Sequence, residues 1–316
     1  MISMKETTKF VYRKQGYYII GNHSAVKLCH WLRMAMLGKG YCYKQKFYGI
    51  KSHRCLQMTP SLPNCTHRCI FCWRAVELTE NEPLTDGPQF IVEESIKAQR
   101  KLIVGYKGDP RVTEQIFEEA MNPNQVAISL AGEPTMYPKL EEMIKEYHRH
   151  GFTTFVVTNG TFPDVIRKIR PTQLYISLIA SNKDMYNKVA RPIGDTWDRF
   201  LESLELFPSV NTRRVIRMTM VKGWNMSNID EYAKLIRKAN PHFVEVKAYM
   251  RVGYSRDRLP DSAMPSHDEI LTFTKKLGEK IGYQLLDDKK ESRVTLLSKE
   301  DYKWRSLEKE QPTNYP

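Results

Sequence analysis

The sequence predicts an α/β protein built as an incomplete (βα)6 TIM-like barrel that carries a basic N-terminal extension. Three observations predict this fold class. Six Val- and Ile-rich segments have the length and composition of buried strands, and amphipathic segments of helical periodicity lie between them. No Gly-rich dinucleotide-binding fingerprint follows any strand, which argues against a doubly wound sheet. Repeated βα units with right-handed crossovers then favour a partial barrel.

The alternating segments occupy residues 56–282, which we predict to form the barrel. Helices such as 137–151 and 227–240 connect neighbouring strands. Ser266 is followed three residues later by Glu269, a capping-box pattern that predicts the start of a further helix and not a catalytic cluster. The expected strands run over 56–62, 126–132, 154–160, 174–180, 213–223 and 242–253.

Residues 283–316 are expected to form a separate C-terminal segment. Two short apolar runs, 283–286 and 293–297, flank a charged turn and are expected to pair as a hairpin. From about residue 299 onward the chain is polar and is expected to be a loose tail.

Residues 1–55 are predicted to form the basic N-terminal extension. Residues 1–60 contain eight Lys and three Arg but only one acid, Glu6, and so hold most of the net charge of +13. Aromatic residues interleaved with these cations suit a surface that neutralises phosphates and stacks on RNA bases. A solvated basic face with aromatics in the core is the alternative. The aromatics are Phe10, Tyr12, Tyr17, Tyr18, Trp31, Tyr41, Tyr43, Phe47 and Tyr48.

Within this extension, residues 24–37 have helical periodicity, and Cys29 falls on the apolar stripe, so it is expected to face inward. No run of about 18 apolar residues could span a bilayer, and the first residues lack the apolar centre of a secretory signal. We therefore expect a cytoplasmic protein without membrane contact.

All six cysteines lie between positions 29 and 72. A reducing compartment and a chain of this length argue against a disulfide framework, so cofactor ligation is the better interpretation. Cys65, Cys69 and Cys72 form a C-x3-C-x2-C motif after the first expected strand, where barrel enzymes place their active sites. Three thiolates on one loop can hold three irons of a cubane and leave the fourth open. A zinc site remains an alternative, although its fourth ligand is missing and His67 is awkwardly placed.

Cys29, Cys42 and Cys55 form an even C-x12-C-x12-C spacing upstream of that loop. Three thiols from separate elements suggest a second cluster that also has an open iron. The alternative is that these cysteines serve as small apolar residues.

The C-x3-C-x2-C motif, with aromatic Phe71 just before its third cysteine, resembles the signature of the radical S-adenosylmethionine superfamily. The resemblance implies a 4Fe-4S cluster on Cys65, Cys69 and Cys72. It also implies that S-adenosylmethionine chelates the open iron and that one electron cleaves it to a 5′-deoxyadenosyl radical, which abstracts a hydrogen atom.

The same resemblance implies further cofactor contacts at the strand ends. Gly132 and Glu133 occupy the place of a Gly-Gly-Glu-like segment, where Gly allows close backbone approach and the carboxylate pairs with the methionine ammonium. Asn159 and Ser177 end the next two strands and are candidates for contacts with the ribose or carboxylate. Ordinary turn or core roles remain open for all four residues.

A narrower resemblance extends over about residues 10–297, to the family that forms the tricyclic wyosine base in tRNA. It implies a carbon–carbon lyase acting on tRNA(Phe) with N1-methylguanosine at position 37, with pyruvate as carbon donor and 4-demethylwyosine as product. The chain lacks a flavin-phosphate loop, so we expect a separate flavodoxin- or ferredoxin-type reductase, and we expect a monomer. The resemblance is carried by residues 27–74, 127–140, 151–160, 171–178 and 244–255.

Two interpretations of pyruvate binding remain open in this family. An open iron of the second cluster can chelate an α-keto acid as a Lewis acid. Alternatively a desolvated lysine forms a Schiff base, and Lys44, two residues after Cys42, fits that role. An exposed phosphate-binding role for Lys44 is the competing interpretation.

Two other functions remain as alternatives for the whole chain. One is a different radical enzyme on RNA, a methylthiotransferase or methyltransferase. The other is a non-catalytic, metal-stabilised RNA-binding protein.

Overall fold

The computed structural model describes residues 4–308 and contains one ten-stranded sheet in the order β1-β2-β3-β4-β5-β6-β7-β8-β10-β9. Strands β3 to β8 are parallel, and they follow one another in sequence order. The two ends of the sheet, β1 and β9, do not pair within the described residues, so the barrel is open on one side. The parallel strands are β3 (Cys55–Thr59), β4 (Gln125–Ile128), β5 (Thr153–Thr158), β6 (Gln173–Ser177), β7 (Arg213–Met220) and β8 (Phe243–Ala248).

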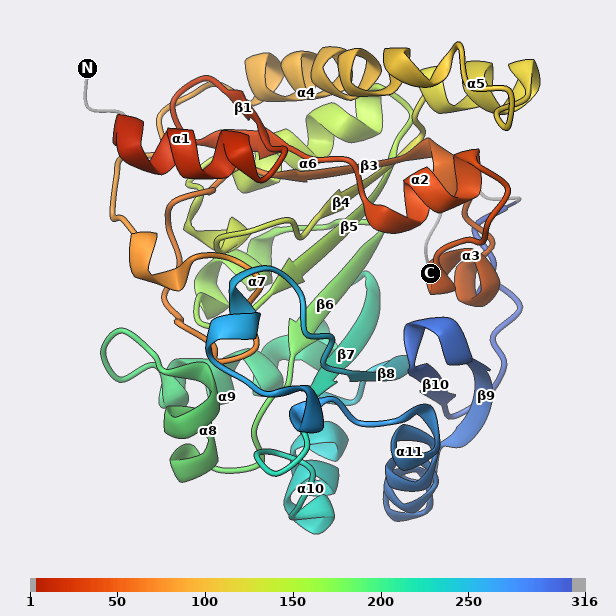
Figure 1. Ribbon diagram of the computed structural model, residues 1–316. Coiled ribbons are helices and arrows are strands. Elements are labelled where there is room, and N and C mark those ends of the chain that lie inside the picture. The colour runs from red at the N-terminus through yellow and green to blue at the C-terminus, as the bar shows by residue number, and fades with distance from the viewer. Residues whose placement is uncertain (1–3, 309–316) are drawn as a thin grey trace.

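Helices follow the strands and surround the outside of the curved sheet, from α4 at the top of Figure 1 to α10 and α11 at the bottom. Helix α6 shows why they pack there, because Leu140, Met143, Ile144 and Tyr147 form one buried stripe. The helices are α4 (Pro88–Ile103), α5 (Glu114–Met121), α6 (Leu140–Arg149), α7 (Pro163–Lys168), α8 (Lys183–Ala190), α9 (Trp197–Leu206), α10 (Ile229–Ala239) and α11 (His267–Ile281). Short 3-10 turns lie at Ser52–Arg54, Val76–Leu78, Val104–Tyr106, Pro134–Met136, Phe207–Ser209, Gly253–Asp257, Asp261–Ala263 and Lys290–Ser292.

The six expected strands are confirmed, as is the parallel sheet of a partial barrel. Every residue of β4 is buried, as expected for a strand covered on both faces. The C-terminal hairpin is also confirmed: β9 (Gln284–Lys289) and β10 (Val294–Ser298) pair antiparallel, and β10 also pairs with β8. The capping box at the start of α11 is present, with Ser266 Oγ accepting from the Glu269 N–H at 3.1 Å.

The expected helix over residues 24–37 is wrong in its first half. Residues Ser24–Val26 form β2, which pairs antiparallel with β1 (Tyr18–Ile20) and with β3. Sheet pairing buries Ala25 and Val26 completely, and this burial overrides the local helical pattern. Helix α2 (His30–Met36) begins after Cys29, which is its N-cap residue and is half-buried.

The expected loose tail is wrong for residues 299–308. Leu307 is buried, and its N–H donates to the Tyr48 carbonyl at 2.8 Å. The Arg213 guanidinium reaches the Trp304 carbonyl at 2.9 Å, which fixes the segment to β7. The remainder of the tail, residues 309–316, lies outside the described residues.

The N-terminal extension contributes to both ends of the barrel. Helix α1 (Glu6–Lys14) packs through Tyr12 in one cluster with Leu62 and Leu130, which follow β3 and β4. Helix α3 (Tyr43–Tyr48) instead packs against the first halves of the strands, through contacts that include Phe155.

Five of the nine aromatic residues in the extension are buried, so the core interpretation holds for them. The buried five are Tyr12, Tyr17, Tyr43, Phe47 and Tyr48.

The division into segments 1–55, 56–282 and 283–316 stays a prediction. No described helix is both long and apolar enough to cross a membrane.

Candidate active site

The C-x3-C-x2-C loop follows β3 and is held against the C-terminal end of α8. The Arg68 N–H donates to the Ala190 carbonyl at 3.0 Å, and the Ile70 N–H donates to the Val189 carbonyl at 3.0 Å. The Ile193 N–H donates back to the Thr66 carbonyl at 2.7 Å. Backbone bonds therefore fix the loop, and the three thiols remain half-buried and free of disulfides.

A buried arginine provides the positive charge beside these thiols. Burial disfavours the charged form of Arg74, but nearby Cys65 and Cys72 raise its pKa above the ordinary value. Burial raises the pKa of Cys65 to about 11, whereas Arg74 lowers it. The loop therefore offers three closely spaced thiols that lose protons on binding iron, next to a cation that balances their charge. This donor set fits a cubane cluster with one open corner.

His67 is turned away from metal ligation. Its Nε2 lies 2.6 Å from the Tyr186 hydroxyl, the ring is buried, and burial lowers its pKa to about 3. Among residues 4–308, no three His, Cys, Asp or Glu side chains are arranged to hold a single metal ion; a cubane cluster differs in that each cysteine binds its own iron.

Gly132 brings the end of β4 directly against the cysteine loop. Its φ is +70°, and a Cβ there would lie 1.9 Å from the Ser61 carbonyl oxygen and 2.7 Å from that of Asn64. Only glycine fits this close approach.

The Glu133 carboxylate joins the ends of two strands. It is buried and accepts hydrogen bonds from the Thr135 N–H at 3.1 Å, the Thr158 hydroxyl at 2.6 Å and the Asn159 N–H at 2.8 Å. Burial raises the pKa of Glu133, and these hydrogen bonds lower it. The carboxylate therefore holds β4 and β5 in register beside the loop.

Asn159 links β5 to the cysteine loop, because its Nδ2 donates to Thr66 Oγ1 at 2.8 Å. Ser177 is the last residue of β6 and lines a different space, the large cavity described next. The structure thus brings Gly132, Glu133 and Asn159 together at the loop, and places Ser177 with Phe71 and Cys72.

A cavity of about 430 Å³ lies between the two cysteine triads. Phe71 and Cys72 line it from the loop, and Cys29, Cys42 and Cys55 all line it as well. The second triad therefore shares one space with the first, although its members come from three separate elements. Further lining residues include Lys44, Ser177, Arg217 and Lys247.

The upstream cysteines occupy the boundaries of secondary-structure elements. Cys29 and Cys42 precede α2 and α3, and Cys55 begins β3. All three are half-buried and free. Burial raises the pKa of Cys42 to about 11 and that of Cys55 further. The three cysteines line the same cavity as several cations, which argues against their serving merely as small apolar residues.

Lys44 is buried inside the barrel. Its Nζ lies 4.4 Å from the centroid of the Phe155 ring and 4.9 Å from that of Tyr175. Burial and the neighbouring Arg217 lower the pKa of Lys44. The competing interpretation of an exposed phosphate-binding lysine is therefore wrong.

Sequence reasoning missed Arg217, Glu245 and Lys247, which project charge into the barrel from β7 and β8. A signal was present, because charged residues alternate with valines in β8. Charged side chains inside a buried strand indicate an interior polar site.

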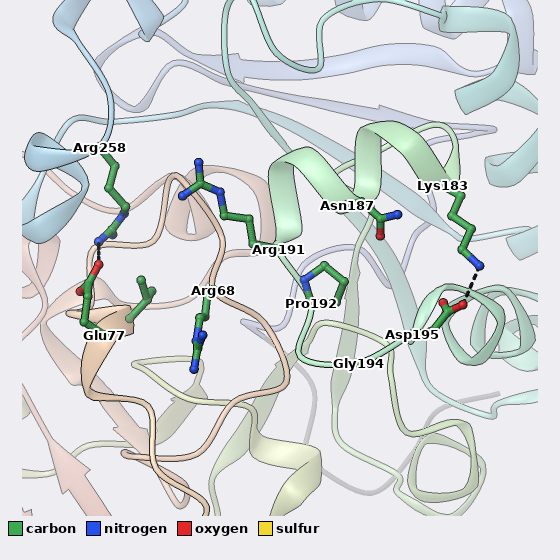
Figure 2. A pocket seen from close by; sticks show the side chains of 10 residues that line it. Arg68, Glu77, Lys183, Asn187, Arg191, Pro192, Gly194, Asp195 and Arg258 are labelled. Atoms are coloured by element: carbon green, nitrogen blue, oxygen red, sulfur yellow. Dashed lines mark hydrogen bonds and ion pairs between the residues drawn. The ribbon is translucent and has the colours of Figure 1, made fainter.

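Arg258 was also missed. Its Nε donates to the Ile70 carbonyl at 3.2 Å, and Nη2 donates to the carbonyls of Cys72 and Arg74. Arg258 borders a surface cleft of about 880 Å³ on the outer side of the cysteine loop. Figure 2 shows Arg68 and Arg191 in the middle of this cleft, between the Arg258–Glu77 and Lys183–Asp195 ion pairs.

Comparison with known proteins agrees with this geometry. Residues 59–236 match the family model of the radical SAM superfamily, and residues 238–299 match the model of wyosine base formation. The S-adenosyl-L-methionine-dependent tRNA 4-demethylwyosine synthase of Pyrococcus horikoshii is 52% identical over 309 residues, covering 95% of this chain and 90% of that protein. The enzyme of the same name from Methanocaldococcus jannaschii is 46% identical and covers 93% and 96%.

Two solved structures are also similar. The structure of TYW1 with a lysine-pyruvate adduct bound has a TM-score of 0.87 and 45% identity, covering 93% of this chain and 96% of that one. The crystal structure of archaeal TYW1 has a TM-score of 0.81 and 42% identity, covering 96% and 99%.

The partial barrel and the cysteine loop after its first parallel strand define a radical S-adenosylmethionine enzyme, with one 4Fe-4S cluster and S-adenosylmethionine as cofactors. Within that superfamily, the chain belongs to the family of tRNA 4-demethylwyosine synthases. The catalytic interpretation therefore replaces that of a non-catalytic, metal-stabilised RNA-binding protein.

Proposed function

We propose that the chain converts N1-methylguanosine-37 of tRNA(Phe) and pyruvate to 4-demethylwyosine. The observation that carries this proposal is the single cavity bordered by Cys72 on one side and by the second cysteine triad and Lys44 on the other. A radical generated at the first triad and a carbon donor held at the second would meet in this space. The names of the similar synthases support the same reaction.

Cys65, Cys69 and Cys72 would hold the catalytic cluster. When bound and reduced, that cluster supplies the electron that cleaves S-adenosylmethionine to a 5′-deoxyadenosyl radical, which takes hydrogen from the N1-methyl group. Phe71 and Ser177, which line the cavity, would contact S-adenosylmethionine.

Gly132, Glu133 and Asn159 would shape the other side of the S-adenosylmethionine site. The carboxylate of Glu133 is already held by Thr135, Thr158 and the Asn159 N–H. These hydrogen bonds orient the carboxylate, which would then also pair with the methionine ammonium.

Lys44 would form an imine with the keto carbon of pyruvate, releasing water. Its amine lies in the cavity wall beside the second triad, shielded from solvent by Phe155 and Tyr175. The similar TYW1 structure with a lysine-pyruvate adduct supports this chemistry. The substrate radical would add to the imine carbon, and breakage of the bond to the carboxylate would release that carbon as a radical anion, which one electron from the reductase and a proton convert to formate. The exocyclic amine of the guanine would then displace the Lys44 amine and close the ring, so that two carbons of pyruvate are retained.

Cys29, Cys42 and Cys55 would hold a second 4Fe-4S cluster beside Lys44. An open iron there would act as a Lewis acid toward the α-keto acid before the imine forms.

The enzyme would work as a cytoplasmic monomer that takes electrons from a separate flavodoxin- or ferredoxin-type reductase. The basic N-terminal extension, with Phe10 and Tyr41 exposed, would bind the tRNA.

An anaerobic assay tests the proposal. Iron-reconstituted protein is incubated with tRNA(Phe) containing N1-methylguanosine-37, doubly ¹³C-labelled pyruvate, S-adenosylmethionine and dithionite, and the nucleosides are analysed by mass spectrometry. We expect 4-demethylwyosine with two labelled carbons and 5′-deoxyadenosine in step with it. A methylthio or methyl product would instead support the alternative radical enzymes, and 5′-deoxyadenosine with no modified nucleoside would contradict the proposal.

A further inference from the structure

The cavity between the cysteine triads carries more positive than negative charge. Lys44, Arg217 and Lys247 line it, and no Asp or Glu is among its lining residues in the described part of the chain. The acid that pairs with Arg217 is Glu245, whose Oε2 lies 4.0 Å from Arg217 Nη1. One carboxylate therefore faces three cations in a partly apolar space, and a buried charge without a partner is costly.

Arg217 is an incompletely paired cation in this cavity wall. Its side chain is 18% exposed, and it packs over the rings of Tyr43 and Tyr175, with its Cζ 5.4 Å and 5.9 Å from their centroids. Within residues 4–308 its guanidinium donates no hydrogen bond to the protein. The two rings orient the plane of the guanidinium, and its N–H groups remain available to a ligand in the cavity. A planar guanidinium with free N–H groups matches a carboxylate in a bidentate manner.

Glu245 lies beside Arg217 and does not neutralise all three cations. Arg217 and Glu245 are register partners on β7 and β8. The other Glu245 oxygen, Oε1, accepts a hydrogen bond from the Tyr48 hydroxyl at 2.8 Å, whereas Oε2 has no hydrogen-bond partner among the described residues. Its separation of 4.0 Å from the guanidinium is too long for a direct hydrogen bond.

Lys247 extends the positive wall toward the same ligand. It lies two residues after Glu245 on β8, and therefore on the same face of the strand. Its Nζ donates to the Ser292 carbonyl at 2.9 Å, which orients the ammonium and leaves two of its protons for another acceptor.

We propose that Arg217, assisted by Lys247, binds the carboxylate of the α-keto acid and thereby presents its keto carbon to Lys44. This inference rests on the proposed function, and it assigns substrate selectivity to residues on β7 and β8. A ligand anchored by its carboxylate cannot be exchanged for a neutral ketone of the same shape, because the guanidinium would stay unpaired.

The competing role for these cations is to balance the negative charge of a cluster on the second triad. The two roles differ in what they discriminate. If these cations balance the charge of a cluster, replacing one should lower the iron content and weaken charged and neutral ligands equally. If they bind a carboxylate, replacing one should weaken only ligands that carry a carboxylate.

Equilibrium dialysis of the anaerobic holoenzyme separates these roles, using ¹⁴C-labelled pyruvate and its neutral analogue pyruvamide. We expect the wild type to prefer pyruvate, and Arg217→Gln to weaken pyruvate binding by about 10- to 100-fold while pyruvamide binding changes little. Arg217→Lys should keep part of the preference, and Lys247→Gln should lose a smaller part. Lys46→Gln is the control, since Lys46 pairs with Asp287 at 2.7 Å and does not line the cavity.

Iron content and thermal unfolding are measured for every variant. Equal weakening of pyruvate and pyruvamide in Arg217→Gln, or unchanged pyruvate binding, would overturn the carboxylate site. Loss of iron together with equal weakening assigns Arg217 to the cluster and also overturns it. If Arg217→Gln does not fold, the test rests on Lys247→Gln, in which an unchanged preference for pyruvate over pyruvamide would overturn the carboxylate site. Absence of 4-demethylwyosine in the assay above, with the pyruvate preference still dependent on Arg217, would reject the proposed function and keep this site.

Discussion

The Nε of Arg258 donates a hydrogen bond of 3.2 Å to the carbonyl of Ile70, a residue that lies between the second and third cysteines of the loop. The same side chain reaches the carbonyl of Cys72. One residue from the C-terminal part of the barrel therefore stabilises the loop on which the catalytic cluster would be assembled.

Replacement of Arg258 tests this contact. Arg258→Gln removes the hydrogen bonds to three loop carbonyls, each contributing about 1 kcal/mol, so the loop should open more easily. We expect faster loss of iron from the first triad when a chelator is added, measured by absorbance near 400 nm. Arg256→Gln is the matched control, because Arg256 is exposed and, within residues 4–308, its side chain donates only to the Arg251 carbonyl. Equal rates of iron loss in the two variants would contradict this role for Arg258.

Gly132→Ala should disrupt the contact between β4 and the loop. The new Cβ would lie 1.9 Å from a backbone oxygen at a φ of +70°, so strain and overpacking together should cost about 3 kcal/mol or more. The control is Gly151→Ala, where φ is +75° but nothing lies within 4 Å, and the expected cost is about 1–2 kcal/mol. Denaturant unfolding measures both, and similar midpoints for the two variants would show that the close approach is absent.

The second triad is tested by single Cys→Ala variants at Cys29, Cys42 and Cys55. Each variant should lose about four of about eight irons yet retain cleavage of S-adenosylmethionine, because the first triad is intact. The measurements are iron and sulfide content and 5′-deoxyadenosine formation. Full iron content in all three variants would remove the second cluster from the account.

His242 should make the folded state sensitive to acid. Burial, followed by Arg214, Arg213 and Lys299, lowers its pKa to about 4 from an ordinary 6.5, and its Nδ1 accepts a hydrogen bond from the Arg214 N–H. A lowered pKa in the folded state means that this stabilisation is complete above pH 6.5 and is lost as the pH falls from 6.5 toward 4.

His242→Asn keeps an acceptor but does not titrate there. The difference in unfolding free energy between wild type and variant should therefore change between pH 7 and pH 4.5, to the disadvantage of the wild type in acid. A difference that is constant with pH would contradict the lowered pKa.

The sequence was sufficient to predict the six parallel strands, since each is a buried Val- and Ile-rich run whose character does not depend on distant partners. It failed at residues 24–37, because Ser24–Val26 gains more by pairing with β3, a segment about 30 residues away, than by local helix formation. It failed again at residues 299–308, because the burial of Leu307 depends on Tyr48, far away in the chain.

The candidate site was predictable where spacing alone determines chemistry, as in the two cysteine triads. Glu133 and Asn159 were identified by position, but their mutual hydrogen bond depends on the neighbouring strands and had no local signal. Arg217 and Lys247 were missed because alternating charges indicate a polar face of a strand, but whether that face points into the barrel depends on how the whole sheet curves.

Mapping the pyruvate adduct after borohydride reduction tests directly whether Lys44 binds pyruvate. The holoenzyme is incubated anaerobically with pyruvate, reduced, digested and analysed by tandem mass spectrometry, with Lys44→Met as the reference. We expect one carboxyethylated lysine, Lys44, and no adduct in the Lys44→Met variant. An adduct on Lys247, or no adduct in the wild type, would contradict the proposal that Lys44 holds pyruvate between the two cysteine triads.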